Sequence, residues 1–230
     1  MPPKESEPLG VPQDLAAIRR QILAFLDTPS RDGKKVGNSK WGVYAFYDYD
    51  AEPIYGGQTN ESLRQRIGRH LTNQRTDAVA MNVLDPFEVA EIEVWPFWEL
   101  QNRNSKDLEA KAFLNAAEYT AFEYVLSRSG FKAVLNEKEI VPTGKIDLPP
   151  SVRGRIIPEE LYDQRKHPDV RIARRATTIA ALARVISERD VNKGLRRTLL
   201  TQARRLGRLA TQRYDEIGGA VPTVEPGEEV

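Results

Sequence analysis

Cysteine is absent from the 230-residue chain, which excludes disulfide bonds, thiol catalysis, iron–sulfur clusters and zinc sites built from cysteine. Histidine is scarce, because only His70 and His167 occur, and this disfavours a metal site made of several histidines. No run approaches the roughly 20 apolar residues of a membrane helix, and residues 1–10 lack the basic and apolar regions of a secretory signal. We therefore expect a cytoplasmic protein that makes no membrane contact.

The charged residues are unevenly distributed, although the net charge of the chain is only +1. Residues 151–214 contain sixteen Lys and Arg residues against six Asp and Glu residues, a net charge of +10, which leaves −9 for the remainder. Such a basic segment predicts a polyanionic partner. With 40% hydrophobic and 29% charged residues, the chain is expected to form one domain with an appendage, or two small domains.

Hydrophobic periodicity predicts alternating helices and strands in the first 140 residues. Helical spacing occurs at 14–27, 60–75 and 105–129. Strand alternation occurs at 41–48, 53–57 and 88–97. The expected fold class is therefore α+β, with a small mixed three-stranded sheet flanked by helices.

Proline and glycine interrupt the chain after residue 140 and predict a linker. Three further helices are expected at 159–166, 169–188 and 190–217. The expected organisation is an N-terminal helix and loop (1–40), a central αβ domain (41–140), a linker (141–158), a basic helical C-terminal region (159–217) and a mobile tail (218–230).

Two tyrosine motifs and one helix carry the most specific signal. Gly-Val-Tyr at residues 42–44 stands on the first expected strand, Tyr-Gly-Gly at residues 55–57 on the second, and the next helix presents Arg66 and His70. In this order the residues resemble the GIY-YIG nuclease family, over roughly residues 41–137. The resemblance implies a small αβ nuclease domain that hydrolyses phosphodiester bonds of double-stranded DNA with one divalent metal ion, normally Mg²⁺, for which Mn²⁺ can substitute. The extra glycine of the second motif is expected only to make the strand end more flexible.

The resemblance also implies catalytic roles. Tyr44 accepts a proton from the attacking water or relays it, and Tyr55 hydrogen-bonds at the scissile phosphate. A phenol with an ordinary pKa of about 10 must be perturbed by a nearby charge to act as a base near neutral pH, and Arg66 provides that charge and stabilises the transition state. On a helical wheel His70 faces the apolar side and Arg66 borders it, whereas Arg69 points outward. We expect a catalytic His70, with a core histidine as the alternative.

The metal ligand implied by the family is one carboxylate on the helix expected at 105–129. On the wheel Glu118 falls within the apolar face, where a carboxylate is costly unless it is paired or binds a cation, and Glu123 points away. Glu123 lies nearer the spacing usual in the family to the following asparagine, here Asn136. We favour Glu118 as the catalytic and metal-binding carboxylate, keep Glu123 as the alternative, and expect Asn136 to be catalytic.

Arginines of the basic region are the expected DNA contacts, because they recur in pairs; solvated helix faces are the alternative. The expected DNA-binding residues are Arg69, Arg174, Arg175, Arg196, Arg197, Arg204 and Arg205. A compact chain with one basic appendage looks most like a stand-alone restriction-type endonuclease, and the apolar faces of the same helices predict a homodimer. The competing function is a non-catalytic DNA-binding or regulatory protein on a GIY-YIG scaffold.

Overall fold

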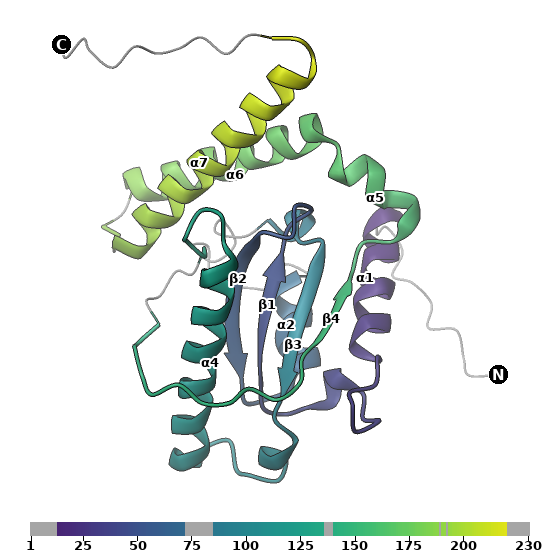
Figure 1. The fold of residues 1–230 in the computed structure, drawn as a ribbon, viewed down its shortest axis with the longest axis vertical. Coiled ribbons are helices and arrows are strands. Elements are labelled where there is room, and N and C mark those ends of the chain that lie inside the picture. The colour runs from purple at the N-terminus through teal and green to yellow at the C-terminus, as the bar shows by residue number, and fades with distance from the viewer. Residues whose placement is uncertain (1–12, 72–84, 136–139, 189, 192, 220–230) are drawn as a thin grey trace.

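The computed structural model describes residues 13–71, 85–135, 140–188, 190–191 and 193–219, which form an α+β fold (Figure 1). Within them, a four-stranded sheet has the order β2-β1-β3-β4, and every neighbouring pair is antiparallel. The strands are β1 (Gly42–Tyr47), β2 (Pro53–Thr59), β3 (Glu91–Pro96) and β4 (Val152–Arg155). The expected three-stranded mixed sheet is therefore wrong in two respects: a fourth strand is present, and the sheet of the described residues is purely antiparallel.

Strand β4 lies in the range where the sequence predicts a linker. It has only four residues and follows two prolines, so its alternation is too short to detect. It pairs with β3 and packs beside α1 (Gln13–Leu26). A Cβ atom on Gly154 would lie 2.9 Å from the ring of Phe25 on α1. Close packing against α1 and pairing with β3, rather than the local pattern, therefore make this segment a strand.

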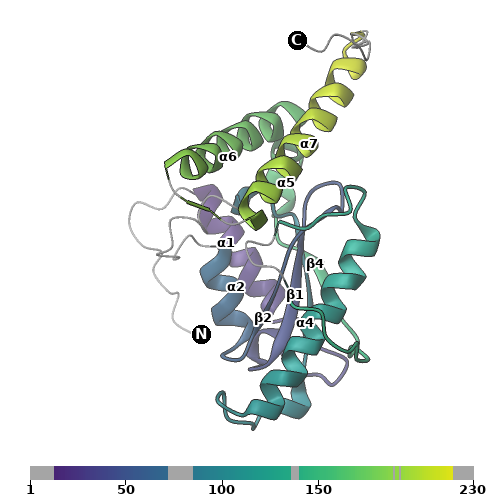
Figure 2. The same ribbon diagram turned by 90° about the vertical axis from the view of Figure 1, so that its left-hand side faces the viewer.

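Helices cover both faces of the sheet, as the view onto the β2 edge shows (Figure 2). One face packs on α1 and on α2 (Leu63–Leu71), and the other packs on α4 (Leu108–Arg128). Alternation along β1 produces this division, because Tyr44 and Phe46 join the core beneath α2 while Val43 joins the core beneath α4. Tyr44 of the first tyrosine motif therefore faces α2.

Three helices follow the sheet in the chain. They are α5 (Glu159–Lys166), α6 (Pro168–Glu188) and α7 (Lys193–Glu216). Helices α6 and α7 lie side by side at the end of the sheet where β1 turns into β2 (Figure 1). Short 3-10 helices occur at Val36–Asn38, Pro86–Glu88 and Trp98–Leu100. In the part of the chain that the structure describes, no helix has the length and hydropathy needed to span a membrane.

A buried ionic cluster joins α6 and α7 to the β1–β2 turn. Oδ2 of Asp48 accepts hydrogen bonds from Arg171, Arg175 and Arg205, at 3.4, 2.9 and 2.5 Å. These four side chains are at most 4% exposed. Glu88 adds a second carboxylate, 2.9 Å from Nε of Arg175; burial raises the pKa of Glu88, and the two neighbouring guanidinium groups oppose that rise. Buried ion pairs between arginines of α6 and α7 and Asp48 therefore join the basic helices to the sheet.

This cluster corrects the expected role of two residues. Arg175 and Arg205 were expected to contact DNA, but their side chains point inward to Asp48 and are not available to a phosphate backbone. Neighbouring residues on a helix point about 100° apart, so only one arginine of each sequence pair can face the interior. A buried guanidinium needs an acidic partner, and Asp48 supplies it.

Candidate active site

The Tyr44 hydroxyl is the centre of a polar cluster on the α2 face of the sheet. Nε of Arg66 donates a hydrogen bond to this oxygen at 3.3 Å, and Nε2 of His70 lies 3.1 Å from it. The rings of Tyr44 and Tyr55 stack with centroids 6.4 Å apart, and the Tyr55 centroid lies 5.2 Å from that of His70. Two adjacent strands and the next helix thus bring together four residues that the sequence singles out.

Helix α2 orients its two polar residues as the wheel predicts. Arg66 and His70 are four positions apart, so they lie on one side of the helix. His70 is buried and Arg66 is half-buried. A neutral imidazole and a phenol can each donate a hydrogen bond to the other, depending on the tautomer. The contact between His70 and Tyr44 can therefore carry a proton in either direction.

Gly57 makes room for the Tyr44 hydroxyl. The two residues are directly opposite each other in the antiparallel register of β1 and β2. A Cβ atom on Gly57 would lie 2.7 Å from the hydroxyl oxygen, too close for any side chain. Gly42 of the first motif has a comparable role, because a Cβ atom there would lie 3.1 Å from the side chain of Leu63. A side chain at residue 57 would therefore displace the Tyr44 hydroxyl, and one at residue 42 would crowd Leu63.

Glu118 lies on α4, across the edge of β2 from the Tyr44 cluster. Nε2 of Gln58 on β2 donates hydrogen bonds to Oε2 of Glu118 at 2.8 Å and to Oδ1 of Asn115 at 2.9 Å. Glu118 lines a small pocket between α4 and strands β1 and β2. Tyr44 borders the same pocket, but its side chain packs on the α2 face of the sheet. Burial raises the pKa of Glu118, while the hydrogen bond from Gln58 and the charge of Arg66 act to lower it. A cation bound here would favour the ionised carboxylate.

The alternative carboxylate takes a different position. Glu123 forms an ion pair with Lys145 at 3.6 Å and is not among the residues that line the pocket of Tyr44 and Glu118. Asn136 lies outside the described residues, so its catalytic role stays a prediction.

The remaining expected DNA contacts lie in two settings. Arg69 forms an ion pair with Glu61, and Arg174 forms a bidentate pair with Asp85 at 2.8 and 2.9 Å. The other three, which are exposed on α7, are Arg196, Arg197 and Arg204. Their contact with DNA stays a prediction. Sequence reasoning gave no role to Gln58, which stands directly after the second tyrosine motif.

The surroundings of Glu118 fit a divalent ion that takes most of its ligands from water and from substrate phosphates. Within the described residues, no group of three acidic or imidazole side chains is arranged so that it could hold a metal ion by itself. Mg²⁺ is commonly bound by one or two carboxylates, retains several waters and takes further oxygens from substrate phosphates. Glu118 offers one carboxylate, and the amide side chains of Gln58 and Asn115 lie beside it.

Residues 40–114 match the family model of the GIY-YIG catalytic domain. The matched range is about one third of the chain; it includes both motif tyrosines, Arg66 and His70, and it ends within α4. Comparison with curated proteins and with solved structures gives no match. Domains of this type are typically nucleases, so the match supports an enzyme. The match over this range therefore supports the GIY-YIG nuclease family for this chain.

Proposed function

We propose that the protein is a metal-dependent endonuclease that hydrolyses phosphodiester bonds of double-stranded DNA at specific sites, as a restriction enzyme does. The observation that carries the proposal is the Tyr44 hydroxyl, which lies within hydrogen-bond distance of both Arg66 and His70. The match to the GIY-YIG catalytic domain supports the same chemistry.

Tyr44 and His70 manage the proton of the attacking water in this proposal. An ordinary phenol, with a pKa of about 10, is a poor base near neutral pH. The positive charge of Arg66, with Nε 3.3 Å from the hydroxyl, favours the phenolate. His70 is within hydrogen-bond distance to take up the proton or return it. The water oxygen forms a bond to phosphorus as the bond to the leaving oxygen breaks, and that oxygen then takes up a proton.

Arg66 and Glu118 act on the phosphate. Arg66 contacts Tyr44 and also lines the adjoining groove, so it can bind a phosphate oxygen and stabilise the charge that develops in the transition state. Glu118 would hold the divalent metal ion, which neutralises phosphate charge when bound. The hydrogen bond from Gln58 fixes the orientation of the Glu118 carboxylate.

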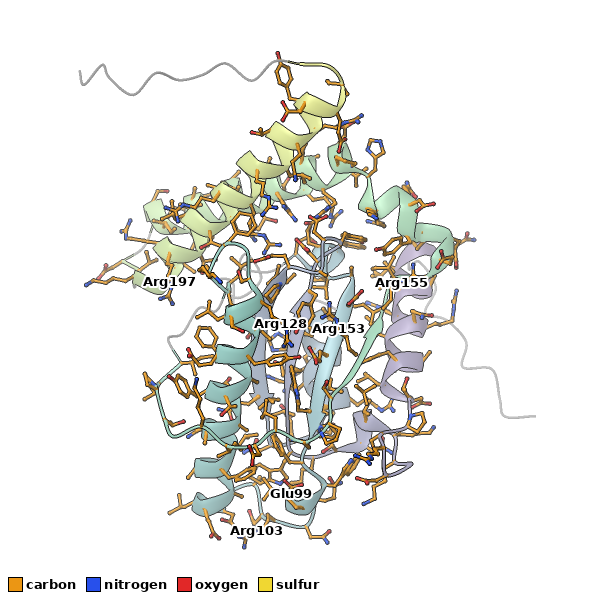
Figure 3. The ribbon with its side chains drawn as sticks, viewed as in Figure 1. Glu99, Arg103, Arg128, Arg153, Arg155 and Arg197 are labelled. Carbon is orange, nitrogen blue, oxygen red and sulfur yellow. The ribbon has the colours of Figure 1, made fainter. Side chains whose placement is uncertain are left out.

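The outer face of α7 is the proposed contact with the DNA backbone. Arg196, Arg197 and Arg204 are exposed and lie within about 100° of one another around the helix. The helix has no acidic residue before Asp215. Arg197 extends from α7 on the side of the molecule where the β2 edge lies (Figure 3). A basic face without carboxylates fits a duplex backbone. A homodimer, which would cut both strands of a palindrome, stays a prediction.

Plasmid cleavage tests the proposal. The purified chain is incubated with DNA of varied sequence in Mg²⁺ or Mn²⁺, with and without a chelator, and the product ends are sequenced. We expect cuts at a defined sequence when metal is present and none when it is chelated. Intact DNA in both metals would contradict the nuclease function and favour the non-catalytic DNA-binding alternative.

Glu118→Gln and Glu123→Gln form a matched pair, because each removes one negative charge from α4. We expect Glu118→Gln to abolish cleavage and Glu123→Gln to retain it. Mg²⁺ should raise the melting temperature of the wild type and of Glu123→Gln, since a ligand of the folded state stabilises it, and should have no such effect on Glu118→Gln. The opposite pattern would assign the metal to Glu123.

A further inference from the structure

A second, more open groove adjoins the catalytic cluster. It lies where the end of β2 meets α2 and α4, and it has a cavity volume of about 320 Å³. Polar and charged side chains dominate its walls, among them Gln58, Asn60, Arg66, Lys111 and Asn115. A volume at the low end of ligand pockets, which span roughly 300–1,000 Å³, suits one nucleotide unit of a strand that passes through.

The charges of the groove favour an anion. Arg66 contributes a positive charge from α2, and Lys111 contributes another from α4. The one carboxylate among the residues that line the groove belongs to Glu61, and the Arg69 guanidinium pairs with it. The walls of the groove therefore hold two cations, and the one carboxylate among its lining residues is paired.

The groove is joined to the proposed reacting centre by two side chains. Arg66 also donates to the Tyr44 hydroxyl, and Gln58 donates to both Asn115 and Glu118. Lys111 and Glu118 are seven positions apart on α4, which separates their backbones by about 10 Å at 1.5 Å per residue. Three base pairs of duplex rise by about the same distance, at 3.4 Å each.

We propose that this groove binds the sugar–phosphate backbone of the cleaved strand beside the scissile phosphate, and that Lys111 contacts a phosphate about three nucleotides along it. The assignment of the strand rests on the proposed nuclease function. Past the other end of α4, Arg208 of α7 lies over the ring of Phe131. The groove and α7 therefore lie at opposite ends of α4, with Glu118 between them, and together they would hold the duplex on both sides of the reacting phosphate.

Lys111→Ala tests the groove, with Lys106→Ala as the matched control. Lys106 is an exposed lysine five positions earlier that does not line the groove. We expect Lys111→Ala to raise KM for DNA about tenfold, the loss of one charge-assisted hydrogen bond, with kcat within about twofold of wild type. The log–log dependence of affinity on salt should become shallower by about 0.9, the value for one phosphate contact. Lys111→Arg and Lys106→Ala should match the wild type.

Fluorescence anisotropy with a labelled duplex and a chelator separates this inference from catalysis. If the wild type fails to cut DNA but Lys111→Ala still binds more weakly and with a shallower salt slope than Lys106→Ala, the nuclease proposal fails and the groove remains an anion site. If the wild type cuts DNA and Lys111→Ala behaves like Lys106→Ala, the groove proposal is overturned. If Lys111→Ala has a lower melting temperature than the wild type, Lys111→Gln replaces it in the same comparison, because glutamine removes the charge and keeps a longer side chain than alanine.

Discussion

Two neighbouring arginines of α7 should have separable effects on stability and on DNA binding. Arg204 is exposed, whereas Arg205 is 3% exposed and lies 2.5 Å from Asp48. Burial lowers the pKa of Arg205 while Asp48 acts to raise it, so its charge depends on that carboxylate. We therefore expect Arg205→Met to destabilise the fold and to have little effect on DNA binding by the face of α7 proposed to contact DNA.

The loss of stability can be bounded from the contacts. Arg205→Met leaves Asp48 with Arg171 and Arg175, at 3.4 and 2.9 Å. Removing one partner of a buried pair costs roughly 3–5 kcal/mol, and two surviving partners place the expected loss near the lower limit, about 3 kcal/mol. At about 2–4 °C per kcal/mol for a chain of this size, the melting temperature should fall by roughly 6–12 °C.

The matched variant replaces the exposed residues Arg196, Arg197 and Arg204 by alanine. Exposed substitutions usually change stability by no more than about 0.5 kcal/mol, so this triple variant should melt like the wild type. If each arginine contacts one phosphate, the salt slope of DNA affinity should fall by about 2.7, three times 0.9. Arg184→Ala, at an exposed arginine of α6 that pairs with Glu188, is the control for a general loss of charge.

Thermal unfolding and anisotropy titrations at several salt concentrations measure both effects on the same samples. The reasoning is refuted if Arg205→Met melts like the wild type but binds DNA with a shallower slope. It is equally refuted if the triple variant binds with the slope of Arg184→Ala, because the outer face of α7 would then contact no phosphate.

Two further predictions concern the cluster around the Tyr44 hydroxyl. Gly57→Ala should lower kcat sharply while the protein remains folded, because the new Cβ atom would lie 2.7 Å from the Tyr44 hydroxyl. Gly68→Ala on α2 is the control and should keep full activity, because a Cβ atom there meets nothing within 4 Å. Equal rates in the two variants would contradict the packing argument. Tyr44→Phe and Arg66→Ala should each reduce kcat far more than DNA affinity, because the proposed roles of both residues act on the transition state. Steady-state kinetics and binding measurements test this. Equal losses of kcat and of affinity would show that the two residues only contact the DNA.

Local geometry explains why much of the fold and of the candidate site could be predicted from the sequence. Side chains alternate along a strand and repeat every 3.6 positions on a helix, so the pattern alone indicates which residues share a face. The helix around Arg66 and His70 was expected to turn His70 inward and to leave Arg66 at the border, and the structure confirms both positions. The same geometry placed Glu118, but not Glu123, on the side of α4 that faces the sheet.

Contacts between distant segments decided the rest. Strand β4 forms because it pairs with β3 and packs against α1. Its four residues are too few for an alternating pattern to predict a strand. The hydrogen bonds from Gln58 to α4 join residues up to 60 positions apart. The charge of the basic region predicted a polyanionic partner for its arginines. Two of them, Arg175 and Arg205, instead bind Asp48, which lies 127 and 157 positions earlier in the chain. A guanidinium is buried only where a carboxylate neutralises it, and only the tertiary structure brings the two together.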